Sequence, residues 1–77
     1  MMEVMIDAGR RIAEIVQVSV GSNTLRVRVR YFDATDGGNV DRWVDIAEVD
    51  LPRQIQGLMT VSQYIAAAAG RLNGGRS

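Results

Sequence analysis

The chain has 77 residues, with nine arginines and no lysine against nine acidic residues, so its formal net charge is zero. Such a length allows one small domain, in which folding buries only about 60% of the surface of the unfolded chain. The balanced charge removes the overall attraction to phosphate expected of a general nucleic-acid binder. Because cysteine and histidine are both absent, disulfides and the usual zinc sites are excluded, and we expect no metal and no cofactor.

Residues 1–9 leave three alternatives open. The short apolar stretch of residues 1–6 can form a fourth strand, an additional helical turn or an arm that reaches a neighbouring chain, and Asp7-Ala8-Gly9 is typical of a turn. Acidic residues flank this stretch, unlike a secretory signal, and no run approaches the ~18 apolar residues that cross a bilayer. We therefore expect a soluble protein without a membrane partner.

Residues 14–51 predict an antiparallel β-meander, because apolar and polar residues alternate in them. The clearest strand is residues 24–32, where three arginines occupy one parity and aliphatic residues the other. A turn centred on Ser22-Asn23 would join it to residues 14–20. This turn predicts three cross-strand pairs: Val16–Val29, Val18–Val27 and Val20–Leu25.

A second hairpin is predicted at Gly37-Gly38, which suits a two-residue turn with positive φ. In this register aromatic and aliphatic residues face one another and Arg30 faces an acidic residue. Such cross-strand pairs stabilise antiparallel strands. The predicted pairs are Asp36–Asn39, Phe32–Trp43, Tyr31–Val44, Arg30–Asp45 and Val29–Ile46.

The meander then has an apolar and a polar face. We expect an inner face of Val16, Val18, Val20, Leu25, Val27, Val29, Tyr31, Val44 and Ile46. We expect an outer face of Gln17, Ser19, Arg26, Arg28, Arg30, Phe32, Trp43 and Asp45. A bulge near Ala47 or Glu48 would restore the alternation after Ile46 and turn the next aliphatic residues inward, and Pro52 would end the strand.

Residues 60–72 predict one amphipathic helix that covers the apolar face of the sheet. Its apolar positions recur at helical spacing: Val61, Tyr64, Ile65, Ala68 and Leu72. Thr60 and Gln63 resemble a capping box, and either Gly70 or residues 73–75 would end the helix. The sequence therefore predicts a single α+β domain, with three strands or four and one C-terminal helix, followed by a flexible tail at residues 73–77.

Catalysis is disfavoured by composition. An acid–base or nucleophilic mechanism needs an activated group, and no histidine, cysteine or lysine is present to supply or tune one. The polar cluster Asp33, Asp36, Asn39 and Asp41 has turn composition and lacks the alternating oxygen ligands of a calcium loop. We expect no catalytic residues and predict that the protein is not an enzyme.

The candidate partner-binding residues are Arg26, Arg28, Arg30, Phe32 and Trp43. Arginine and tryptophan are enriched at protein interface hot spots, and the open edges of a meander invite strand addition by another chain or another copy. Arginine with exposed aromatics on a sheet also suits single-stranded nucleic acid. A third alternative is a solvated face whose charges are paired internally, with Asp45 beside Arg30.

The predicted protein is a small β-meander with one helix, in which all basic residues are arginine and cysteine is absent. It is similar in general character to bacteriophage accessory or virion proteins. That resemblance implies a non-enzymatic interaction module, a structural or assembly subunit of a phage-like virion located in the cell or in the assembled particle. Its partners would then be other protein subunits in a homo- or hetero-oligomer. The alternatives are a single-stranded nucleic-acid-binding protein and a small inhibitor that docks on a host enzyme.

Overall fold

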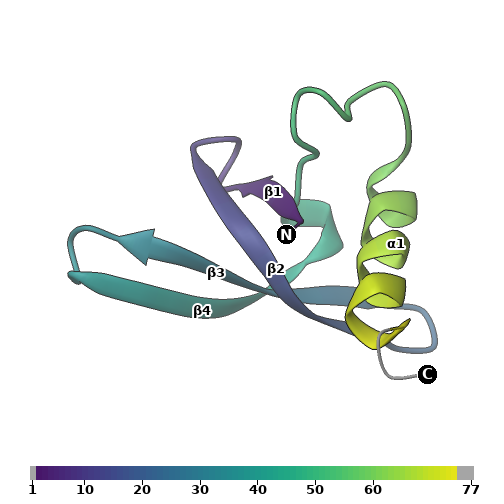
Figure 1. Ribbon diagram of the computed structural model, residues 1–77, viewed down its shortest axis with the longest axis horizontal. Helices are drawn as coiled ribbons and strands as arrows, with labels where there is room; N and C mark the ends of the chain where they lie inside the picture. The colour runs from purple at the N-terminus through teal and green to yellow at the C-terminus, as the bar shows by residue number, and fades with distance from the viewer. Residues whose placement is uncertain (1, 75–77) are drawn as a thin grey trace.

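The computed structural model describes residues 2–74, with side chains up to Leu72. Its elements in chain order are β1 (Glu3–Ile6), β2 (Arg11–Val20), β3 (Leu25–Asp33), β4 (Gly38–Asp45), the 3-10 helix η1 (Ile46–Glu48) and α1 (Val61–Gly74). The strands form one antiparallel sheet in the order β1-β2-β3-β4 (Figure 1). This confirms the predicted α+β meander and selects its four-stranded form.

Strand β1 decides between the alternatives for the N-terminal segment. Val4 and Ile6 alternate with more exposed neighbours and are fully buried, so β1 contributes core side chains while it pairs with β2. The predicted turn follows it. Asp7, Ala8 and Gly9 have φ of 54°, 59° and 81°, and the Gly9 N–H donates to the Ile6 carbonyl at 3.1 Å.

The register of β2 with β3 was predicted correctly near the turn and wrongly beyond it. Val20–Leu25 and Val18–Val27 are pairs, but the register shifts between Ile15 and Gln17, so that Ile15 rather than Val16 faces Val29. Such a bulge reverses the side-chain alternation along one strand. Ala13 and Ile15 are consequently buried, whereas Val16 is only half-buried and Val20 is 71% exposed.

The predicted register of β3 with β4 was wrong, although its faces were correct. The observed pairs are Arg26–Asp45, Val27–Val44, Arg28–Trp43, Val29–Arg42, Arg30–Asp41, Tyr31–Val40, Phe32–Asn39 and Asp33–Gly38. The loop is therefore residues 34–37. Asp33 closes it, because its side chain accepts from the Thr35 N–H at 2.9 Å and its carbonyl from the Gly37 N–H at 2.8 Å. Gly37, with φ of 73°, supplies the left-handed residue that this loop needs.

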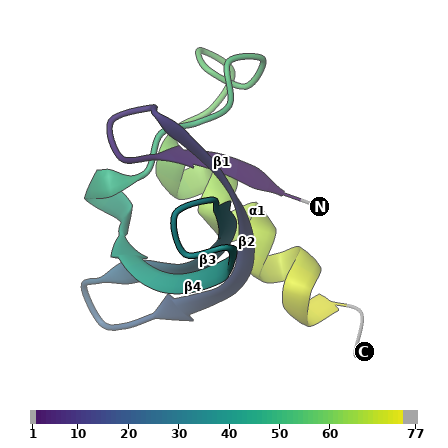
Figure 2. The ribbon, with the colours of Figure 1, turned by 90° about the vertical axis from the view of Figure 1, so that its left-hand side faces the viewer.

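After β4 the chain turns inward and partly closes the sheet. Asp45 caps η1, accepting from the Ala47 N–H at 3.0 Å, and this 3-10 turn takes the place of the predicted bulge. Val49 and Leu51 are buried as a result. Between them, Asp50 and Met5 exchange backbone hydrogen bonds of 2.8 and 2.9 Å, so the sheet curls around its core (Figure 2).

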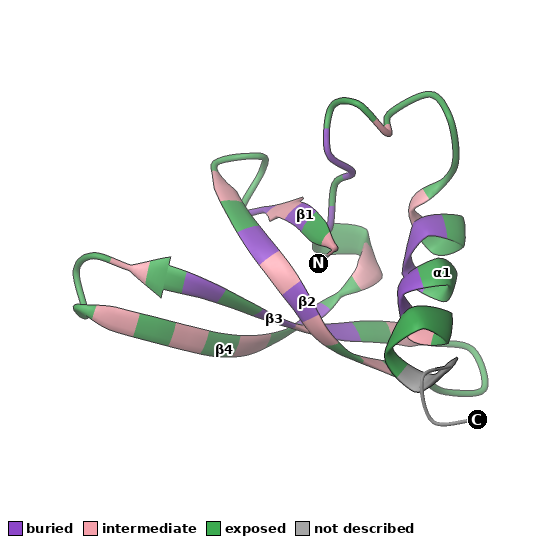
Figure 3. Ribbon diagram, viewed as in Figure 1, coloured by how far each residue is buried: buried purple, intermediate pink, exposed green. Residues whose placement is uncertain are grey.

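Helix α1 begins with the predicted capping box. The Gln63 side chain accepts from the Thr60 N–H at 2.8 Å and the Thr60 hydroxyl accepts from the Gln63 N–H at 3.1 Å. Tyr64, Ile65 and Ala68 join the strand residues in one core (Figure 3). The core prediction for Leu72 was wrong, because its side chain is 44% exposed.

Of the two predicted ends of the helix, Gly70 was wrong and residues 73–75 agree with the structure, because α1 continues to Gly74. Residues 73 and 74, predicted as part of a flexible tail, are therefore helical. Residues 75–77 of the predicted tail lie outside the described residues. No helix within residues 2–74 has the length and apolar character required to cross a membrane.

Candidate interaction site on the outer face of the sheet

The three candidate arginines project from one face of β3. They alternate with Val27 and Val29, which are buried on the opposite face, as the period of two along a strand requires. Each arginine lies in the middle of a row of side chains that crosses three strands. The rows are Ser19–Arg26–Asp45, Gln17–Arg28–Trp43 and Glu14–Arg30–Asp41.

Arg30 is neutralised within its own row. Its Nε and Nη2 donate to the two carboxylate oxygens of Asp41 at 2.8 and 3.0 Å, a bidentate geometry that fixes both groups. The hydrogen bond from Arg30 lowers the pKa of Asp41, and the bond to Asp41, with a smaller contribution from Glu14, raises the pKa of Arg30. Arg30 is the only one of the three arginines with an ion pair among residues 2–74.

Arg28 is differently placed, opposite Trp43. Its Nε is buried and has no hydrogen-bond partner within residues 2–74. Its charge adds to the lowering of the pKa of Asp41, but both oxygens of that carboxylate already accept from Arg30. A buried donor without an acceptor costs about 1–3 kcal/mol. Arg28 thus acts on Asp41 through its charge but forms no ion pair among the described residues.

Arg26 also lacks an ion pair within residues 2–74. The carboxylate that faces it, Asp45, accepts from the Ala47 N–H at the start of η1. Arg26 itself is exposed. We use the name central patch for Arg26, Arg28 and Trp43.

The two candidate aromatic residues do not form the predicted pair. Phe32 faces Asn39, whereas Trp43 faces Arg28 two rows away. Phe32 is 64% exposed and Trp43 is 38% exposed. The structure thus brings Trp43 together with the arginines and places Phe32 near the tip of the β3–β4 hairpin.

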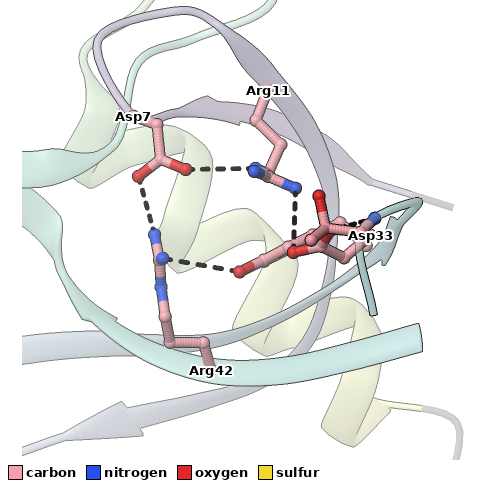
Figure 4. A network of polar contacts seen from close by, with 6 residues as sticks. Asp7, Arg11, Asp33 and Arg42 are labelled. Carbon is pink, nitrogen blue, oxygen red and sulfur yellow. Dashed lines mark hydrogen bonds and ion pairs between the residues drawn. The ribbon is translucent and has the colours of Figure 1, made fainter. Parts of the chain in front are cut away.

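A second cluster, which the sequence analysis missed, lies on the concave side of the sheet (Figure 4). Asp7 accepts from Arg42 Nη2 at 2.9 Å and from Arg11 Nε at 3.1 Å, and Arg11 Nη1 lies 4.0 Å from Asp33 Oδ2. The Arg11 guanidinium also stacks on the Tyr31 ring, 4.3 Å from its centroid. These two arginines and two aspartates balance in charge. The parity of Arg42 with Val40 and Val44 indicates its inward position, but nothing local indicates Asp7.

The second cluster has structural rather than catalytic chemistry. The hydrogen bond from Arg42 lowers the pKa of Asp7, so this carboxylate is a weaker base than usual, and the pKa of Arg42 is raised by the same bond. Neither shift moves a group toward the neutral range in which acid–base catalysts work. No group of three or more metal-ligating side chains occurs in the part of the chain that the structure describes.

Comparison of the chain with protein-family models, with curated proteins and with solved structures finds no match.

Proposed function

We propose that this protein is a non-enzymatic protein–protein interaction module that binds its partner through the central patch. The observation that supports this proposal most directly is Arg28, whose Nε is buried without an acceptor. Because Arg30 already donates to both oxygens of Asp41, we infer that the acceptor for Arg28 comes from another molecule. A guanidinium binds carboxylates and phosphates in a bidentate geometry, and a carboxylate of a partner protein is the acceptor that we propose.

Trp43 supports the same proposal. It faces Arg28 directly across the β3–β4 ladder, and its ring is partly exposed on a strand that is not covered by α1. Tryptophan and arginine side by side are the residue types that contribute most to protein interfaces when they become desolvated. The preferred partner surface therefore offers an acidic side chain next to an apolar one.

Single-stranded nucleic acid is disfavoured by the acidic residues on the same face. Glu14 and Asp41 flank Arg30, and Asp45 faces Arg26, so three carboxylates are interleaved with three arginines. Phosphate binding depends on uncompensated positive charge and weakens steeply with salt. A fluorescein-labelled oligothymidylate at low salt is the suitable probe, and we expect no change in its fluorescence anisotropy.

The functional proposal is tested by comparing proteins captured by the purified chain with those captured by variants. In the double variant Arg28→Ala/Trp43→Ala we expect loss of the partner with an unchanged circular dichroism spectrum. Arg53→Ala, at an exposed position in the loop before α1, is the matched control and should retain the partner. Equal capture by wild type and the double variant would exclude the central patch as the binding site.

The identity of the captured protein separates the finer alternatives. A particle subunit would agree with the prediction of a phage-like virion component, which stays a prediction, whereas an enzyme whose activity falls on binding would agree with the inhibitor alternative. Both use the central patch.

A further inference from the structure

Strand β4 is the free edge of the sheet. It pairs with β3 over eight consecutive residue pairs without a register shift, and no other strand in residues 2–74 pairs with it. The opposite edge, β1, is partly closed by the backbone hydrogen bonds between Met5 and Asp50. Figure 1 shows β4 along the outer margin of the sheet. Strand β4 has neither proline nor a bulge, two features that block pairing at an edge, and its one inward-pointing charge, Arg42, is paired with Asp7.

We propose that β4 pairs with β4 of a second copy of this chain, antiparallel and about a twofold axis at Arg42. In such a symmetric pair the central residue faces itself, and residues at equal distances on either side face each other. The proposal does not depend on which partner the central patch binds, although Trp43 of that patch would lie beside the dimer axis.

The side chains favour this register. With Arg42 at the centre, Asp41 faces Trp43 of the second copy and Val40 faces Val44 of the second copy. Asn39 then faces Asp45 of the second copy. The two valine pairs meet on the concave side, where Val44 is already buried. The one contact between like charges, Arg42 with Arg42 of the second copy, is offset because each guanidinium lies 2.9 Å from its own Asp7 carboxylate.

The neighbouring symmetric registers are less favourable. A centre at Asp41 sets this carboxylate against Asp41 of the second copy and places Val40 against Arg42. A centre at Trp43 sets Asp41 against Asp45 of the second copy. Because Asp41 is paired with Arg30 as Arg42 is with Asp7, like charge alone does not separate the centres at 41 and 42. We expect the axis at Arg42 because, among these three registers, it is the one that sets Val40 against Val44.

Pairing at Arg42 would join the two outer faces into one surface. The row Glu14–Arg30–Asp41 would continue into Trp43, Arg28 and Gln17 of the second copy. Two central patches would then lie on one continuous sheet.

The absence of cysteine in the chain allows a direct test by single-cysteine variants under a mild oxidant. Residues that face each other in an antiparallel pair have Cα atoms about 4.5–5.5 Å apart, within the range that a disulfide spans. Residues one step from the axis face their own copies diagonally at about 7–8 Å, beyond that range. We expect Arg42→Cys to give a covalent dimer on a non-reducing gel, and Asp41→Cys, Trp43→Cys and the control Arg53→Cys to remain at background. Equal cross-linking of all four variants would overturn the proposal. Cross-linking that is strongest at residue 41 or 43 would also overturn it.

Because Arg42→Cys removes a contact to Asp7, a second measurement uses the unmodified chain. Light scattering after size exclusion should give a mass that rises from monomer toward dimer with concentration. Hydrogen exchange measured at both ends of this range should show added protection in β4 and none in β2. A monomeric mass at all concentrations, or a dimer with unchanged exchange in β4, would contradict the proposal.

Discussion

Arg42 donates a hydrogen bond of 2.9 Å to Asp7 across 35 positions of the sequence. The bond joins the middle of β4 to the turn between β1 and β2, and neither of these two strands is a neighbour of β4 in the sheet. Arg11 donates a hydrogen bond to the other oxygen of the same carboxylate, and its guanidinium stacks on the Tyr31 ring. The open end of the curled sheet is therefore held by charged groups around one aromatic ring.

This arrangement predicts acid sensitivity. The pKa of Asp7 is lowered by Arg42 and that of Asp41 by Arg30, so both carboxylates bind protons more weakly in the folded state than in the unfolded state. Their stabilisation is complete above the ordinary aspartate value of 3.8 and is lost as the pH falls below it. We expect the urea midpoint to decrease between pH 4 and pH 2.

The Asp7→Asn variant checks the origin of that decrease. Its urea midpoint should be lower than that of wild type at pH 7, and it should fall less on acidification. Asp36→Asn, at an exposed position in the β3–β4 loop, is the control and should follow the wild-type curve. Parallel curves for wild type and Asp7→Asn would show that Asp7 does not contribute.

The backbone conformation of Ala8 favours glycine at this position. Its φ of 59° lies in the left-handed region, which costs a residue with a Cβ about 1–2 kcal/mol. Part of the gain from glycine is offset by its greater freedom in the unfolded chain. We expect Ala8→Gly to raise the free energy of unfolding by about 0.5–1 kcal/mol. Ala66→Gly, on the exposed side of α1, should lower it by about 1 kcal/mol, and a decrease in both variants would contradict the prediction.

The Tyr64 side chain connects α1 to β1. Its hydroxyl donates to the Glu3 carbonyl at 2.8 Å, and Tyr64→Phe should lower the free energy of unfolding by about 1 kcal/mol. Burial raises the pKa of Tyr64, so its contribution is present below the ordinary value of 10.0 and is lost as the pH rises through the folded pKa. The variant should therefore lose less stability than wild type in alkali. An unchanged urea midpoint at pH 7 would show that the bond is not stabilising.

We expect substitution of Arg28 to weaken partner binding without lowering the free energy of unfolding. Methionine at this position keeps much of the apolar stem and removes the buried Nε that has no acceptor within residues 2–74. Removing an unsatisfied donor is neutral or stabilising, so Arg28→Met should leave the free energy of unfolding unchanged or raise it by up to about 1 kcal/mol. Arg30→Met, which breaks the ion pair with Asp41, should lower it. Destabilisation by both substitutions to the same extent would show that Arg28 has a structural role.

Alternation in the sequence is sufficient to assign most faces of the meander. The side-chain period of a strand is two, so the β3–β4 hairpin kept its predicted faces even though its partners were displaced by four positions along β4. Local patterns also identify the Thr60–Gln63 capping box and the turn at Asp7-Ala8-Gly9, because the groups that form them are close in the sequence. The same alternation placed five candidate residues on one face of the sheet: Arg26, Arg28, Arg30, Phe32 and Trp43.

Which of those five residues lie together was decided only by the tertiary structure. The side chain of Asp33 accepts from the Thr35 N–H and its carbonyl from the Gly37 N–H, which closes a longer hairpin loop. The longer loop separates Phe32 from Trp43 and pairs Arg30 with Asp41. The bulge in β2 replaced Val16 by Ile15 in the core, and Asp50 and Arg42 reached partners near the N-terminus. Register and closure depend on competition between distant contacts, which the period of a single strand does not encode. The sequence by itself thus determined the meander, its helix and the faces of β3 and β4. Folding in three dimensions determined the role of β1, the face of the first half of β2 and which charges within residues 2–74 are paired.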